Sequence, residues 1–319
     1  MRHVRFPILT ARRCVCTRAK RTDREYIQLL HRDLPQLYEL AQHEFEPMWQ
    51  KVSDVVAGAH SEGGPRAILD LASGGVAQPA MALAQRFVRA KVVASDNNPT
   101  LVLQALNRIQ QHGLQPRVEV KEIDLTTIAA LASSGDDNAF AEAPSIDAVT
   151  CSLGLFMVQP SHHMSLLRGI NGLLCPAGTL VATVWDEPKL EELGARVLSR
   201  VLGRENMPSS PHASASLGGG TADQLLSDAG FEPIAPLHNE VGEQRITLGP
   251  LTEDRAFLLG LLPYQGALAS LHEQHGMEGV FARAHDAFIE EAQAHVDAES
   301  GEVVLRSRYR VLAARKPSK

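Results

Sequence analysis

Ala67-Ile68-Leu69-Asp70-Leu71-Ala72-Ser73-Gly74-Gly75 is the stretch of this chain that decides its fold. It joins an apolar run to an acid and a turn of small residues, a pattern typical of a buried parallel strand that ends at a ligand. About twenty residues later, Val92-Val93-Ala94-Ser95-Asp96 is a second apolar run that ends in a carboxylate. Because the carboxyl ends of parallel strands meet at one edge of a sheet, the two stretches predict a site for an adenosine-containing cofactor.

Strand and helix patterns alternate regularly from residue 66 onward. Such alternation predicts an α/β fold with a mostly parallel sheet and helices on both faces. The expected strands are 67–71, 91–95, 118–123, 146–153, 179–185, 231–236 and 303–314, and the expected helices between them include 79–88, 99–112 and 161–174.

The chain as a whole is interpreted as one domain behind a basic N-terminal segment. Apolar residues recur at three- and four-residue steps through 23–59, which predicts a helical cap. We expect a cofactor-binding core over 66–200, a mobile loop over 206–220 that is rich in Gly, Ser and Pro, and substrate-side elements over 221–319. Residues 133–144 are polar and predict a surface loop.

Charge is distributed unevenly along the 319 residues, whose formal net charge is −6. Seven of the 31 basic residues lie within residues 1–21, which hold no acid, so the rest of the chain has 24 basic and 37 acidic residues. An Arg-rich start without acids predicts a transit peptide and a mitochondrial location, with plastid or cytoplasm as alternatives. A disordered basic tail or a nucleic-acid arm is the other interpretation of this segment.

The acidic body makes nucleic acid an unexpected partner, because such affinity depends on neutralising phosphates. No apolar run approaches the roughly twenty residues that a membrane span requires. The four cysteines fit neither a zinc pattern nor a disulfide framework, so no metal site is predicted.

Acids and small residues at three successive strand ends fit a cofactor made of a nucleoside and an amino acid. Gly74 and Gly75 allow the backbone to approach a ligand closely. Asp96 can accept hydrogen bonds from both ribose hydroxyls, and Asp124 can face the adenine amino group with Leu125 against the ring. NAD fits less well for two reasons. Its binding turn requires a third glycine, which this chain lacks. It also uses the backbone N–H groups of a helix N-terminus, and Pro79 removes one of these donors here.

Residues 66–185 resemble the class I S-adenosylmethionine-dependent methyltransferases, and are most similar to the group of ubiquinone and menaquinone biosynthesis methyltransferases. The first motif is Leu69-Asp70-Leu71-Ala72-Ser73-Gly74, the second is Val93-Ala94-Ser95-Asp96-Asn97-Asn98-Pro99, and the fourth strand reads Ile146-Asp147-Ala148-Val149-Thr150-Cys151-Ser152-Leu153-Gly154. The resemblance implies a Rossmann-like, seven-stranded sheet with an antiparallel last strand and helical cap elements, and S-adenosylmethionine as cofactor. The implied contact residues are Asp70, Ala72, Ser73, Gly74, Gly75, Asp96, Asn97, Asp124, Leu125, Cys151 and Ser152.

One departure from the family pattern lies in the turn itself. Gly74-Gly75-Val76-Ala77-Gln78 holds an extra residue and lacks the later glycine, so Val76 is placed to crowd the cofactor's carboxylate. The turn either bulges around the cofactor or binds it more weakly.

The expected reaction is methyl transfer to a small, apolar or aromatic metabolite. The segment after the fourth strand lacks the signature associated with amino-nitrogen methylation of bases or glutamine, and Cys175-Pro176 reverses the order found in cytosine C5 enzymes. Candidate bases are His162, His163 and Asp186, although His162 and His163 also read as an exposed first helical turn. The alternative is a catalytically inactive methyltransferase-like protein that serves as an organelle assembly or binding factor. The oligomeric state is left open.

Overall fold

The computed structural model describes residues 21–60, 63–134, 146–203, 217 and 220–318. Residues 1–20 of the predicted transit segment lie outside this range, as do most of the predicted surface loop 133–144 and of the predicted mobile loop 206–220.

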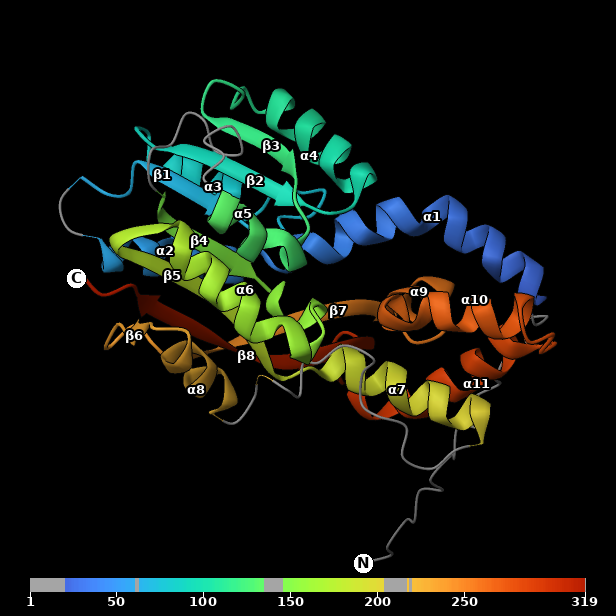
Figure 1. Ribbon diagram of the computed structural model, residues 1–319. Helices are drawn as coiled ribbons and strands as arrows, with labels where there is room; N and C mark the ends of the chain where they lie inside the picture. Colours follow the sequence, from blue (N-terminus) through green and yellow to red (C-terminus); the bar gives the residue numbers. More distant parts are fainter. Residues whose placement is uncertain (1–20, 61–62, 135–145, 204–216, 218–219, 319) are drawn as a thin grey trace, which may run out of the picture.

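A single mixed sheet forms the centre of the fold (Figure 1). Its order is β3-β2-β1-β4-β5-β8-β6, and β7 also pairs with β8. The first five strands in this order run parallel, and β8 is antiparallel to its neighbours β5, β6 and β7. This confirms the predicted Rossmann-like α/β fold with an antiparallel C-terminal strand. The strands are β1 (Ala67–Asp70), β2 (Lys91–Asp96), β3 (Val118–Glu122), β4 (Ile146–Ser152), β5 (Leu174–Glu187), β6 (Glu232–Pro233), β7 (Glu240–Pro250) and β8 (Glu302–Arg315).

The sheet has one strand more than the sequence predicts. β6 and β7 both pair antiparallel with β8, β6 at its C-terminal end and β7 along the rest, so the two form an interrupted edge beside one long strand. The additional strand is β7, whose first half is polar. It forms because β8 offers it a ladder from Glu302 to Val311, in which the register shifts between Thr247 and Gly249.

Helices cover both faces of the sheet. α2, α3 and α4 lie on one face and α5 and α6 on the other, as expected when successive crossovers turn with the same hand (Figure 1). α4 begins where the Asn98 side chain accepts a hydrogen bond from the N–H of Thr100 at 2.9 Å. The helices are α1 (Asp23–His43), α2 (Glu46–Ala59), α3 (Ala80–Arg86), α4 (Pro99–Gln111), α5 (Ile128–Ser134), α6 (Pro160–Leu173), α7 (Lys189–Leu202), α8 (Thr221–Asp228), α9 (Asp254–Gly260), α10 (Gln265–Glu273) and α11 (Val280–Ala292).

The buried apolar side chains form two clusters. The first, here the sheet core, joins the strands to the helices on both faces and contains Leu69, Val149 and Val181. The second, here the helical block, joins α7, α9, α10 and α11 to the N-terminal half of α1 and to the ends of β7 and β8. Phe45, between α1 and α2, packs against both clusters.

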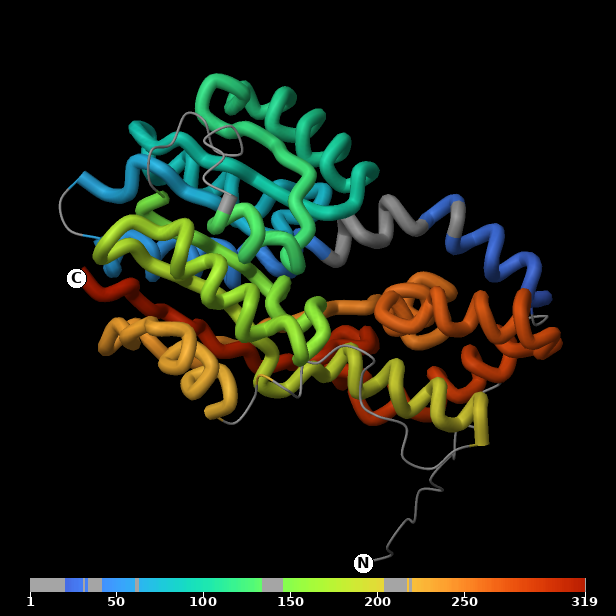
Figure 2. Tube along the Cα trace, in the orientation of Figure 1, coloured from blue at the N-terminus to red at the C-terminus, as the bar shows by residue number. Residues whose placement is uncertain are grey.

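α1 connects the helical block to the sheet (Figure 2). At its first residue, the Asp23 carboxylate accepts hydrogen bonds from the N–H groups of Val280 and Phe281 at 3.1 and 2.9 Å, and so caps α11. The next turn places Tyr26 against Phe257 and Phe281, with ring centroids 5.2 and 6.0 Å apart. Within the described part of the chain, no helix has the length and apolarity that crossing a membrane requires.

Candidate functional site

Asp70, the acid at the end of β1, is buried within the protein. Its Oδ2 accepts hydrogen bonds from the Ser73 hydroxyl at 2.6 Å and the Ala80 N–H at 3.1 Å. Its Oδ1 accepts one from the Thr150 hydroxyl at 2.6 Å. Burial raises the pKa of the Asp70 carboxyl to about 7, while these three donors act in the opposite direction. Asp70 therefore fastens the turn to β4 and to the start of α3, and it has no exposed surface to offer a ligand.

The turn after β1 follows an unusual backbone path. Ala72, Gly74 and Ala77 have φ angles of 56, 62 and 53°. An ideal Cβ on Gly74 would meet no atom within 4 Å, whereas one on Gly75 would lie 2.3 Å from Oε1 of Gln104. Gly74 therefore borders open space and leaves room for a ligand, whereas Gly75 lies against the side chain of Gln104 on α4.

The structure brings Asp96 to this turn. Its Oδ2 accepts a hydrogen bond from the N–H of Gly74 at 3.2 Å, and its Oδ1 accepts one from the N–H of Asn98 at 3.0 Å. The two loops are also joined through Ser73, whose N–H donates to the carbonyl of Ser95 at 2.8 Å. Asp96 is partly exposed, so its carboxylate can still accept further hydrogen bonds. Asn97, the next residue, is exposed.

Asp124 follows β3 and starts a short 3₁₀ helix, Leu125–Thr127. Its Oδ1 accepts hydrogen bonds from the N–H and the hydroxyl of Thr126, both at 2.8 Å. The carboxylate is exposed and its other oxygen remains available, whereas the side chain of Leu125 is buried. The N–H of Ile123 donates to the carbonyl of Asp96 at 3.0 Å, so the ends of β2 and β3 lie side by side.

Gly154, just after β4, is where the three loops converge. A Cβ on this glycine would lie 2.7 Å from the Cβ of Ala72, 2.7 Å from the Sγ of Cys151 and 3.8 Å from a methyl carbon of Leu125. Three predicted contact residues from three strand ends thus surround one position that only glycine fits. Gly154 stands in the fourth-strand motif but was not among the predicted site residues, since only the tertiary contact reveals why it must lack a side chain.

Cys151 and Ser152 have different environments. Cys151 is fully buried, and burial raises the pKa of its thiol to about 12. The Ser152 hydroxyl lies 3.1 Å from that of Thr183 on β5 and 3.7 Å from the sulfur of Met48 on α2. Ser152 therefore links β4 to β5 beneath α2.

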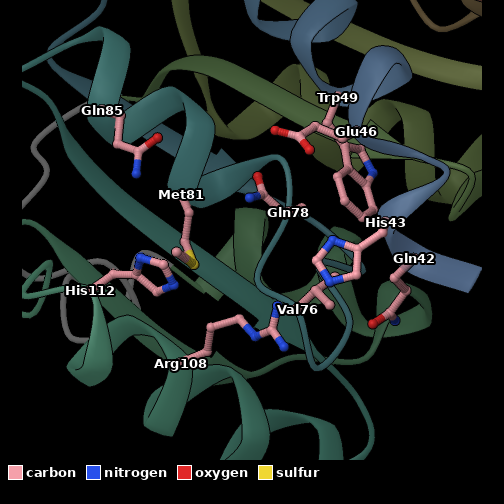
Figure 3. A pocket seen from close by; sticks show the side chains of 10 residues that line it. All are labelled: Gln42, His43, Glu46, Trp49, Val76, Gln78, Met81, Gln85, Arg108 and His112. Carbon is pink, nitrogen blue, oxygen red and sulfur yellow. The ribbon is translucent and has the colours of Figure 1, made fainter. Parts of the chain in front are cut away.

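A cavity of about 240 Å³ lies beside the turn, between α2, α3 and α4 (Figure 3). The side chain of Val76 points into it, so the residue expected to crowd the cofactor is turned toward α4 and α2. The end of α1 reaches the same cavity. Its lining residues are Gln42, His43, Glu46, Trp49, Val76, Gln78, Met81, Gln85, Arg108 and His112.

The three candidate bases have structural surroundings of different kinds. His162 is exposed at the start of α6. His163 is buried, its Nε2 lies 2.9 Å from the carbonyl oxygen of Val158, and burial lowers its pKa. Asp186 accepts hydrogen bonds from Arg310 at 2.5 Å and from Arg308 at 3.2 Å. Asp186 thus joins β5 to β8, whereas His163 bonds within the segment that leads into α6.

The residues at the carboxyl ends of the parallel strands have a geometry that fits a nucleoside cofactor. Gly74 provides open space beside the partly exposed carboxylate of Asp96, and Asp124 provides an exposed carboxylate at the next strand end. Among the described residues, no cluster of His, Cys, Asp and Glu could hold a metal ion.

Comparisons with known proteins locate the similarity in the fold. No protein-family model matches the chain, and no curated protein sequence matches it. An O-methyltransferase family protein from Burkholderia thailandensis is 20% identical, with a TM-score of 0.41, over 69% of this chain and 67% of its own. The S-adenosylmethionine-dependent methyltransferase SibL is 20% identical, with a TM-score of 0.38, over 61% of this chain and 51% of its own. The cyclase SpnF is 18% identical, with a TM-score of 0.46, over 84% of this chain and 80% of its own.

These similarities bear on neither activity nor substrate. The strand order identifies the fold, because the long antiparallel strand β8 lies between β5 and β6. On that ground the chain has the Rossmann-like α/β fold of S-adenosylmethionine-dependent methyltransferases.

Proposed function

We propose that this protein transfers a methyl group from S-adenosylmethionine to a small apolar or aromatic metabolite. The observation that carries the proposal is the convergence of three strand-end loops. Asp96 accepts the N–H of Gly74 at 3.2 Å, and Ala72, Cys151 and Leu125 surround the bare Cα of Gly154.

Each residue has a role that its surroundings allow. Asp96 accepts the ribose hydroxyls, and the exposed oxygen of Asp124 accepts the adenine amino group, with Leu125 on the adenine side. Asp70, Ser73 and Thr150 hold the turn in its bound shape before the cofactor arrives, because their hydrogen bonds are already made. The cofactor supplies an activated methyl group. Well-oriented reactants recover roughly 7–11 kcal/mol of a barrier, so positioning by the chain accounts for most of the catalysis.

The acceptor is proposed to need little help from a protein base. His163 and Asp186 are occupied by Val158 and by two arginines, which leaves His162, exposed at the start of α6, as the remaining candidate. A base is required only when the nucleophile must lose a proton in the transition state. A phenol that ionises near neutral pH, or another group that attacks without losing a proton first, fits this site best.

The first test is a calorimetric titration of S-adenosylhomocysteine into protein that begins at residue 21. Arg21 is kept because its guanidinium pairs with Asp254 at 2.6 Å. Asp96→Ala removes charge-assisted hydrogen bonds worth about 1.5–3 kcal/mol, so affinity should fall roughly ten- to hundred-fold. Asp228→Ala, an exposed acid on α8, is the matched control and should leave affinity unchanged.

Lack of any binding by the wild-type protein would contradict the proposal. It would favour the alternative, an inactive methyltransferase-like protein that acts as a binding or assembly factor. The mitochondrial location is proposed from residues 1–21 alone, and imaging a fusion of these residues to a fluorescent protein tests it.

A further inference from the structure

β3 (Val118–Glu122) is the last strand at one end of the sheet, and no described strand pairs with its outer side (Figure 1). Its inner side pairs with β2. The N–H of Val92 donates to the carbonyl of Arg117 at 2.8 Å, and the N–H of Ile123 donates to the carbonyl of Asp96 at 3.0 Å. These two contacts fix which backbone groups of β3 face β2 and which face outward.

Every second residue of β3 directs its N–H and C=O groups outward, because these groups alternate in direction along a strand. Given the two contacts with β2, the outward groups are those of Val118, Val120 and Glu122. The N–H of Val118 donates to the carbonyl of Leu114 at 2.9 Å. Among the described residues, the N–H and C=O groups of Val120 and Glu122 have no hydrogen-bond partner. β3 thus presents an open edge with Val120 at its centre.

α4 packs on β2 and β3 and carries two exposed leucines beside this edge. Arg108 and His112 line the cavity that borders α3, so their side of α4 faces the middle of the sheet. Leu103 and Leu106, which are 58% and 47% exposed, lie on the opposite side, because successive helical residues are turned by about 100°. The two leucines therefore overhang the open edge of β3.

The charges along β3 are complementary to those of a second copy of the same strand. When two copies pair antiparallel about Val120, this residue faces its own counterpart and the two exchange hydrogen bonds. On either side of this pair, Glu119 of one copy stands opposite Lys121 of the other, where cross-strand side chains come closest. Within one chain the Glu119 carboxylate already lies 3.4 Å from the Nζ of Lys121. The pairing extends this ion pair across the two strands.

The sequence of β3 disfavours the neighbouring registers. A shift by two residues in one direction places Glu122 opposite Glu122, and like charges directly opposite each other are destabilising. A shift in the other direction places Pro116, which has no N–H, opposite Val120. Short charged strands usually discourage pairing at a sheet edge. Here opposite charges alternate, so the strand matches its own copy in one register.

The same two-fold relation brings the two copies of α4 together. Neighbouring strands are about 4.8 Å apart, so a helix above the space between β2 and β3 lies about 5 Å from the two-fold axis. Two such helices are about 10 Å apart, a distance at which helices pack. Leu103 and Leu106 then meet their counterparts and are removed from water.

We propose that this protein forms a symmetric dimer in which the β3 strands pair antiparallel about Val120. The two copies of α4 pack against each other through Leu103 and Leu106, and the two sheets become one. The dimer does not depend on the proposed function, since no residue of this interface is assigned to the cofactor.

The first test measures the association state of the full chain by analytical ultracentrifugation between about 1 and 100 μM. The wild type should sediment as a dimer. Leu106→Glu places a charge in the apolar contact and should raise the dissociation constant at least tenfold. Val241→Glu is the matched control, because Val241 is 55% exposed on β7, and it should leave the dissociation constant unchanged.

Two charge variants test the register. Glu119→Lys places lysines opposite each other and Lys121→Glu places glutamates opposite each other, so either protein alone should dissociate at least tenfold more readily. A mixture of the two should form a heterodimer, because each lysine then faces a glutamate of the other copy. The ion pair within the chain is lost in both variants, so tighter association on mixing reports contact between copies.

Three results would overturn the inference. The first is a wild type that stays monomeric over the whole concentration range. The second is a dimer that Leu106→Glu and both charge variants leave intact, which would place the interface elsewhere. The third is the absence of a heterodimer when the charge variants are mixed. Circular dichroism of each variant recognises loss of the fold, and S-adenosylhomocysteine binding, measured separately, tests only the proposed function.

Discussion

The hydroxyl of Thr150 donates a hydrogen bond to the carboxyl of Asp70, with 2.6 Å between Oγ1 and Oδ1. The two residues are 80 positions apart and belong to the neighbouring parallel strands β4 and β1. Asp70 also binds Ser73 and Ala80, so a single buried carboxyl fixes both ends of the turn that borders the candidate cofactor site. The stability of the turn is thus tied to the protonation of one acid.

Thr150→Val should lower the free energy of unfolding by about 1–3 kcal/mol, because a buried acceptor loses its donor while the shape of the side chain is kept. Chemical denaturation at pH 8 measures the change. Thr150→Ser keeps the hydroxyl and should retain more of the stability. Equal losses for Val and Ser would show that packing of the methyl group, rather than the hydrogen bond, stabilises this position.

The stability of the protein should also depend on pH through Asp70. Burial raises the pKa of this carboxyl from 3.8 to about 7, so the folded state holds the proton more tightly than the unfolded chain. The contribution of Asp70 to the free energy of unfolding is complete below pH 4 and is lost as the pH rises to 7, a change of at most about 4 kcal/mol. Denaturation of wild type and Asp70→Asn across this range measures it.

The difference between these two proteins isolates the acid from the other titrating groups. The wild type should lose stability relative to Asp70→Asn as the pH rises. A difference that stays constant, or that moves in the wild type's favour, would mean that the three donors keep Asp70 ionised in the folded protein.

Gly154→Ala should disturb the candidate site. Its Cβ would lie 2.7 Å from both the Cβ of Ala72 and the Sγ of Cys151, which forces the loops after β1 and β4 apart. Overpacking of this kind costs about 1–3 kcal/mol. We expect a lower melting temperature and weaker S-adenosylhomocysteine binding.

Gly266→Ala is the matched control for that substitution. Gly266 lies in α10, and a Cβ there would meet no atom within 4 Å. Because alanine favours the helix over glycine, the control should be neutral or stabilising by up to about 1 kcal/mol. Equal effects of the two substitutions would refute the role of close contact at Gly154.

Asp23→Ala should destabilise the helical block. The substitution removes the acceptor for the N–H groups of Val280 and Phe281, a loss similar to that of a helix cap and worth about 0.5–2 kcal/mol. Thermal unfolding followed by circular dichroism measures the effect. Glu25→Ala is the comparison, because among the described residues the Glu25 carboxylate bonds to nearby Thr22, and its loss should cost less.

Local sequence determined the strands of the sheet core and the edge where the site lies. An apolar run followed by an acid and small residues predicts a buried parallel strand and its turn, and β1, β2, β3 and β4 lie within about two residues of the predicted ranges. The closeness of Asp96 to the turn follows from the same pattern, since neighbouring parallel strands end at one edge. These features depend on short segments and on a topology with few alternatives.

Tertiary structure alone decided the features that depend on remote partners. Residues 240–245 have no strand pattern, yet they become part of β7 because β8 supplies the ladder and the ring of Tyr309 covers Gly242, where a Cβ would lie 2.2 Å from the ring carbon Cζ. Asp186 is predicted as a base from its position after a strand, but the arginines that engage it come from β8, more than 120 residues away. A residue's position along a strand is encoded locally, whereas its hydrogen-bond partners and the room beside it are set by segments that meet only in the folded chain.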